Sequence, residues 1–239
     1  MKQYNGGAFE SVKDKRTIKA STLLTTASPQ DKGGVTYLPQ DILEQSRVGI
    51  CTAISLVQRQ NKITGKKFSE DFQYLLQKHF YDKNWIEGSS PLHSLKVGKK
   101  YGFLPASEWT YTTQTDRDLP YSEYIAKLQA ISEEEMERLI TLCTDKLFGY
   151  AQVDLSNPQD FAKQIDESKG GLICRFVLDN NWWTDKKGKY SQKESDISPL
   201  RPHKTPLSGH QVIVSPYDLT LNDLFTIPNT WGTDWCRLG

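Results

Sequence analysis

The hydrophobic period of this sequence changes at Gly170-Gly171. Before this point the apolar residues recur at helical spacing. After it, two short segments, Leu172–Leu178 and Gln211–Ser215, are rich in the β-branched and aromatic residues that are typical of strands. A chain whose helices come first and whose strands come later is expected to be an α+β protein with two segregated lobes.

Several segments carry the helical pattern. Cys51–Gln60 has the apolar stripe of a buried helix, which places Cys51 in the first turn. Ser69, followed by acidic residues, predicts the start of a second helix. Further helices are expected at about 91–101, after Ser132 and after Asn157-Pro158.

These patterns divide the chain into three parts. Residues 1–35 form a polar N-terminal arm rich in Gly, Lys, Ser and Thr, residues 36–125 form a mainly helical lobe, and residues 126–239 form a mainly β lobe. A long polar loop over about 179–209 separates the two predicted strands, and a loop of this length is usually functional or mobile.

The charge balance and the hydropathy exclude several kinds of partner. With 30 Lys and Arg against 29 Asp and Glu, the formal net charge is +1, which gives no field that would attract nucleic acid. The longest apolar runs, such as Val212-Ile213-Val214, are far shorter than a membrane span, and the first residues lack the apolar stretch of a secretion signal. We therefore expect a soluble cytoplasmic protein that binds neither nucleic acid nor membrane.

The cysteine pattern indicates thiol chemistry rather than a structural role for at least one cysteine. The 4 cysteines are scattered without the close spacing of a zinc site or a disulfide framework. They are Cys51, Cys143, Cys174 and Cys236. No metal site is expected, and only Cys51 has the positive end of a helix dipole beside it, which favours the reactive thiolate.

Three further residues could complete a nucleophilic site around Cys51. His210 precedes a predicted strand, where a rigid element could hold it as the base, whereas the other histidines are expected to be structural. Asn229 could fix the orientation of the imidazole, with Trp231 shielding their hydrogen bond from water. Gln45, shortly before Cys51, could donate to an oxyanion together with the N–H of Cys51.

At these residues the chain resembles the papain-like cysteine peptidases. Gln45-x5-Cys51 is similar to the family's spacing of oxyanion donor and nucleophile, Gly209-His210-Gln211-Val212 to its Gly-His-Ala-Val strand, and Asn229-Thr-Trp-Gly-Thr-Asp-Trp235 to its Asn-Ser-Trp-Gly-x-x-Trp motif. The resemblance covers about 36–239. Val48 stands where secreted members have a disulfide-bonded cysteine, which is more similar to bacterial and phage-type branches of the family.

The resemblance implies a two-lobed papain-like fold that forms one catalytic unit. It implies a cysteine-type endopeptidase without cofactor, acting as a monomer on a protein or peptide substrate. Cys51 would be the nucleophile, His210 the acid and base, Asn229 the orienting residue and Gln45 the oxyanion donor. The substrate would be bound by residues that line the cleft between the lobes, namely Gly88, Ser89, Gly209 and Trp231.

Two alternatives remain open at this stage. The same fold and the same thioester intermediate would serve a deamidase, an acyl transferase to an amine or a peptidoglycan amide hydrolase. A non-catalytic binding module is the other alternative, because Ser89 replaces a family glycine and the chain ends at Gly239, where family members continue into another strand. Either that last strand is lacking, or the chain is a truncated or naturally abbreviated version. We expect Trp182 and Trp183 to pack between the lobes rather than contact substrate.

Overall fold

A computed structural model describes residues 8, 37–153, 161, 163–165, 168–178, 208–215 and 227–233. Outside these residues lie most of the N-terminal arm, Asn157-Pro158, most of the 179–209 loop with Trp182 and Trp183, Cys236 and the last residues of the chain. The sequence-based expectations for those segments therefore stay predictions.

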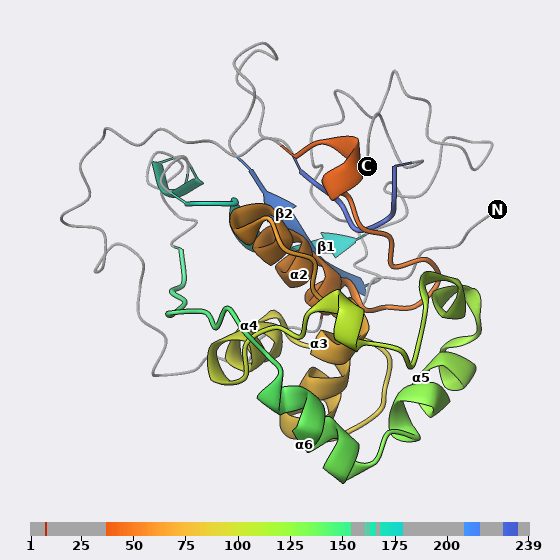
Figure 1. Cartoon of the computed structure of the whole chain (residues 1–239). Helices are drawn as coiled ribbons and strands as arrows, with labels where there is room; N and C mark the ends of the chain where they lie inside the picture. Colours follow the sequence, from red (N-terminus) through yellow and green to blue (C-terminus); the bar gives the residue numbers. More distant parts are fainter. Residues whose placement is uncertain are drawn as a thin grey trace, which may run out of the picture.

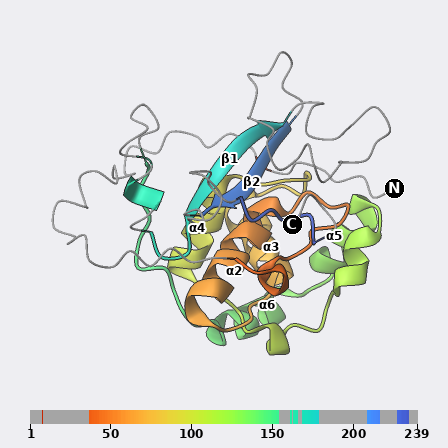
Figure 2. The same cartoon turned by 90° about the horizontal axis from the view of Figure 1, so that it is seen from above.

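Helix α2 (Cys51–Thr64) runs through the centre of the described structure, between a two-stranded sheet and the remaining helices (Figures 1 and 2). It begins at Cys51, as the sequence predicts, and ends at Gly65, whose φ of 71° is a left-handed conformation that glycine adopts without strain. Every residue of its first two turns is buried, because the sheet and the other helices cover it from opposite sides.

The helices below α2 share one hydrophobic core. They are α3 (Glu70–Gln77), α4 (Pro91–Lys100), α5 (Tyr121–Gln129) and α6 (Glu133–Thr141). Ser69 caps α3 by accepting a hydrogen bond from the N–H of Phe72, and Ser132 caps α6 in the same way, as predicted. Because Met136 and Leu139 of α6 lie in this core, helical packing continues past residue 125, where the sequence pattern placed the boundary between lobes.

Short turns connect these helices. A π-helical turn, η2 (Lys78–Asp82), continues α3, and three 3₁₀ turns lie at η1 (Pro39–Asp41), η3 (Ala106–Glu108) and η4 (Gln114–Asp118). A π turn inserts an extra residue into a helix and often accompanies a functional site.

The sheet consists, among the described residues, of β1 (Leu172–Leu178) paired antiparallel with β2 (Ser208–Val214). His210 lies opposite Phe176 in the register. The sequence placed the second strand at Gln211–Ser215 with His210 at its mouth. That start is wrong, because Ser208 and Gly209 already pair with Leu178 and Val177, so His210 lies inside the strand. The expected α+β class is confirmed.

No helix in the described part of the chain is both long and apolar enough to cross a membrane. Within the same residues, no group of His, Cys, Asp or Glu side chains has the arrangement of a metal site.

Candidate active site

The imidazole of His210 is held in one tautomer by Asn229. The backbone N–H of Thr230 donates to Oδ1 of Asn229 at 2.7 Å, which identifies that end of the amide as the oxygen. Nε2 of His210 lies 2.7 Å from the same oxygen. Since an amide oxygen only accepts, Nε2 carries the hydrogen, and in a neutral ring Nδ1 is then the basic nitrogen. This nitrogen has no hydrogen-bond partner among the described residues.

Trp231 covers the ring of His210. The two rings are stacked, with centroids 4.4 Å apart and an interplanar angle of 22°, and both residues are fully buried. Burial lowers the pKa of His210 to about 4, against a smaller opposing effect of the hydrogen bond with Asn229. In this closed arrangement the imidazole is therefore neutral at pH 7.

Cys51 lies at the positive end of α2, next to the strand that carries His210. It is the first residue of the helix and is fully buried. The backbone N–H of Gln211, the residue after His210, donates to Sγ of Cys51 over 3.4 Å. Hydrogen bonds that favour the charged form of a thiol, together with the helix dipole, are the features that make a cysteine nucleophilic.

Gln211 also joins β2 to the first turn of α2 through its side chain. Its Nε2 donates to the carbonyl of Thr52 at 3.1 Å and to Oγ of Ser55 at 2.7 Å. No role was predicted for Gln211 from the sequence. The sequence did contain a signal for its role, namely a polar residue between His210 and the apolar Val212-Ile213-Val214. Since β2 is buried on both faces, an amide at this position needs hydrogen-bond partners.

Gln45 is bound to the segment that carries Asn229. Its backbone N–H donates to the carbonyl of Thr230 at 2.8 Å, and Oγ1 of Thr230 donates to its Oε1 at 2.7 Å. Because Oε1 accepts this bond, Nε2 is the end of the amide that can donate to a ligand. Gln45 is fully buried, and Thr230, which the sequence reading passed over, connects it to Asn229.

Two of the four residues expected to bind a substrate, Ser89 and Gly209, contact Ala8, whereas Trp231 is stacked on His210. The N–H of Ala8 donates to the carbonyl of Gly209 at 2.9 Å, and Ala8 forms an isolated parallel bridge with Ser89, next to Gly88. Nε of Arg175 donates to the carbonyl of Ala8 at 3.1 Å. Ala8 thus lies between the segment at Gly88-Ser89 and the strand that carries His210.

A buried charged cluster lies behind Gly88 and Ser89. Nζ of Lys78 donates to the carbonyls of Ile86 and Gly88 and pairs with Asp82 at 3.0 Å. Asp82 in turn accepts from Oγ of Ser89 at 3.2 Å and lies 2.5 Å from Nδ1 of His93. His93 therefore has a structural partner, as expected, while Lys78 was missed although its i,i+4 spacing to Asp82 was a signal.

The other described cysteines lack these features. Burial raises the pKa of Cys143 and the pKa of Cys174 to about 12 each, so both thiols are neutral at pH 7.

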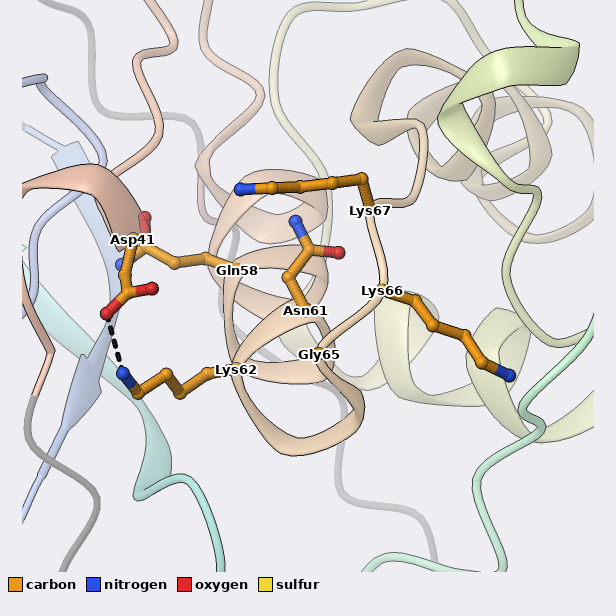
Figure 3. A pocket seen from close by; sticks show the side chains of 7 residues that line it. All are labelled: Asp41, Gln58, Asn61, Lys62, Gly65, Lys66 and Lys67. Atoms are coloured by element: carbon orange, nitrogen blue, oxygen red, sulfur yellow. Dashed lines mark hydrogen bonds and ion pairs between the residues drawn. The ribbon is translucent and has the colours of Figure 1, made fainter.

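A separate hollow lies at the opposite end of α2 (Figure 3). Lys62 on its wall pairs with Asp41 at 2.7 Å, and Lys66 points away from that pair. At a rise of 1.5 Å per residue the far end of α2 is about 20 Å from Cys51, so this hollow is not part of the thiol site.

The described helices and strands have a fold similar to that of a papain-like cysteine protease. The chain is similar to the crystal structure of Xylellain, a cysteine protease from Xylella fastidiosa, with a TM-score of 0.65 and 19% sequence identity over 99% of this chain and 88% of that chain. No family model and no curated protein sequence matches the chain. At this identity the likeness shows the fold, and it agrees with the fold that the sequence motifs implied.

Proposed function

We propose that this protein is a cysteine-type endopeptidase in which Cys51 is the nucleophile and His210 is the acid and base. The observation that carries the proposal is the orientation of His210. Its Nε2 is engaged by Asn229, and its basic Nδ1 has no hydrogen-bond partner among the described residues. The neighbouring residue of the same strand contacts Sγ of Cys51.

The proposed reaction proceeds through a thioester. Nδ1 of His210 takes the proton from the thiol, and Sγ of Cys51 attacks the carbonyl carbon, whose π electrons move to the oxygen. Nε2 of Gln45 and the N–H of Cys51 donate to this oxyanion. When the carbonyl re-forms, the C–N bond breaks and His210 gives its proton to the leaving amine. Water then attacks the thioester with His210 as base, which releases the acid and restores the thiol.

A peptide substrate is supported by the position of Ala8. Its N–H and carbonyl are both bound, and the residue is 3% exposed between Gly209 and Ser89. The surrounding segments thus have the donors and acceptors that an extended backbone requires. The structural neighbour Xylellain is a cysteine protease, which supports the same class of substrate.

Peptide-library digestion followed by mass spectrometry tests the proposal. The full chain is expected to cleave internal peptide bonds, Cys51→Ala to abolish cleavage, and His210→Ala to lower its rate by at least about 10³-fold. Cys143→Ala is the matched control and should retain full activity, since that thiol is neutral and distant from the site.

Other products would identify the alternatives. Loss of ammonia from glutamine side chains without cleavage would indicate a deamidase, and transfer to an added amine would indicate a transferase. Peptide binding by the wild type and by Cys51→Ala alike, without turnover of any acyl donor, would indicate a binding module. Each of these results would replace the endopeptidase proposal.

A further inference from the structure

The turn that carries Gln45 has a backbone conformation that needs support. Ser46, directly after Gln45, has a φ of 55°, in the left-handed region that residues with a Cβ seldom adopt. Such a conformation costs on the order of 1 kcal/mol and persists only where the surroundings hold it. The groups that hold the turn therefore determine where the amide of Gln45 lies.

Arg117 of η4 binds the backbone on both sides of this turn. Its Nη1 donates to the carbonyl of Glu44 at 2.9 Å, and its own carbonyl accepts from the N–H of Arg47 at 3.1 Å. Gln45 and Ser46 thus lie between two hydrogen bonds to a single residue that is distant in sequence.

The guanidinium of Arg117 is itself fixed by the first turn of α3. Its Nε donates to Oδ1 of Asp71 at 2.9 Å, and its Nη2 lies 3.3 Å from Oε2 of Glu70. The residue is only 3% exposed. Each of the three guanidinium nitrogens therefore has a different partner. Only Nη1 bonds to the turn, through the carbonyl of Glu44.

Asp71 is in turn a rigid anchor. Oδ1 also accepts from the hydroxyl of Tyr124 at 2.8 Å, and Oδ2 accepts from Oγ1 of Thr112 at 2.7 Å. Burial alone would lower the pKa of Arg117, but the carboxylates of Asp71 and Glu70 outweigh it and hold that pKa above its ordinary value. The guanidinium is charged under all usual conditions and strengthens its bond to the Glu44 carbonyl.

We propose that Arg117 is a positioning residue that acts through Gln45, holding its amide where it donates to the oxyanion. This inference rests on the proposed peptidase function. The opposite side of the turn is held by Thr230, so Gln45 is fixed between the helical core and the segment that carries Asn229. An oxyanion donor is effective only when it is already in place as charge develops, which is what two-sided support provides.

A double-mutant cycle tests the proposal on the full chain, with the peptide that the library experiment identifies as the fastest substrate. Lysine keeps the charge but lacks the three-way fork of arginine, so Arg117→Lys should lose the hydrogen bond to the Glu44 carbonyl. We expect Arg117→Lys to lower kcat by about 10-fold with KM unchanged, and Gln45→Ala by about 10²-fold. The double variant should be no slower than Gln45→Ala alone, within about two-fold.

Two readouts separate positioning from a loss of stability. The rate at which iodoacetamide alkylates Cys51, a reaction that forms no oxyanion, should be unchanged in Arg117→Lys. The change in melting temperature caused by Arg117→Lys should be the same in the wild-type and Gln45→Ala backgrounds. Arg138→Lys is the matched control, because Arg138 is an exposed arginine that also pairs with a carboxylate. It should leave kcat unaltered.

The outcomes distinguish this inference from the proposed function. Losses in kcat that multiply in the double variant, or no loss in Arg117→Lys, would overturn the role of Arg117 while leaving the peptidase intact. A wild type that cleaves no peptide would overturn both. If Arg117→Lys does not fold, Gln114→Ala replaces it, since the exposed amide of Gln114 donates to the same carbonyl at 3.2 Å. It should lower kcat by about 2- to 3-fold, again only when Gln45 is present.

Discussion

His210 combines a fixed tautomer with complete burial. Asn229 determines which ring nitrogen carries the hydrogen, and the surrounding side chains lower the pKa of the ring to about 4. The folded protein therefore takes up a proton at His210 less readily than the unfolded chain, whose histidine has a pKa of about 6.5. The contribution of the lowered His210 pKa to the free energy of unfolding is fully present above pH 6.5 and is lost as the pH falls toward 4.

The sign of this dependence can be measured with His210→Gln. Between pH 7 and pH 4 the wild type should lose up to about 3 kcal/mol more unfolding free energy than His210→Gln, as judged by urea denaturation at each pH. Equal losses in the two proteins would contradict the neutral imidazole. A wild type that gains stability relative to the variant over this range would instead indicate that folding raises the pKa of His210 rather than lowering it.

At the scale of elements, the π turn η2 supports the segment at Gly88 and Ser89. Burial lowers the pKa of Lys78, although Asp82 opposes this effect. Burial would likewise raise the pKa of Asp82, but hydrogen bonds from His93 and Lys78 hold it below its ordinary value. Asp82 is therefore ionised at pH 7, and its buried pairing with Lys78 at 3.0 Å supports the segment.

Lys78→Met tests this support. The substitution removes the donors to Ile86 and Gly88 and leaves the carboxylate of Asp82 buried without its cation, so the unfolding free energy should fall by about 3–5 kcal/mol. Urea denaturation at pH 7 measures the loss. Lys83→Met, at an exposed position just after η2, should change stability by less than about 0.5 kcal/mol. A similarly small loss in Lys78→Met would mean that the ion pair makes no net contribution to the free energy of unfolding.

At the scale of the whole molecule, one described residue of the N-terminal arm, Ala8, packs against the strand that carries His210. Gly209 illustrates how closely it packs, because a Cβ there would come within 2.0 Å of the carbonyl oxygen of Ala8. Cys51 and His210 are both fully buried in this arrangement. Access of any reagent to Cys51 should therefore depend on the contacts of Ala8.

Ala8→Pro removes the N–H that donates to Gly209 and leaves the rest of the chain intact. Iodoacetamide should then label Cys51 about 3- to 10-fold faster, the factor that corresponds to one hydrogen bond of about 1 kcal/mol. Peptide mass spectrometry measures the rate, and the slow labelling of Cys143 and Cys174 should not change. Ala8→Gly keeps the N–H and is the control. Equal rates in all three proteins would show that Ala8 does not limit access.

The candidate site residues could be named from the sequence because their signals are local. Cys51 at a helix start, Gly209-His210 at a strand and Asn229-Thr230-Trp231 are short patterns, and the structure brings all of them together at one end of α2. The helix starts at Ser69 and Ser132 were predictable for the same reason, since an N-cap is decided within one turn. The start of β2 was missed, because Ser208 and Gly209 are strand residues only through their pairing with β1.

What the sequence alone determined is thus the α+β class and the identity of the nucleophile, base, orienting and oxyanion candidates. Only the tertiary structure decided that Nδ1 is the basic nitrogen of His210, that burial keeps the ring neutral, and that Arg117 and Lys78 support the flanking segments. These features depend on contacts such as that between Arg117 and Glu44, 73 residues apart in the chain. Hydrogen bonds over such separations have no periodic or local signature in a sequence, because they exist only once packing has removed water from both partners.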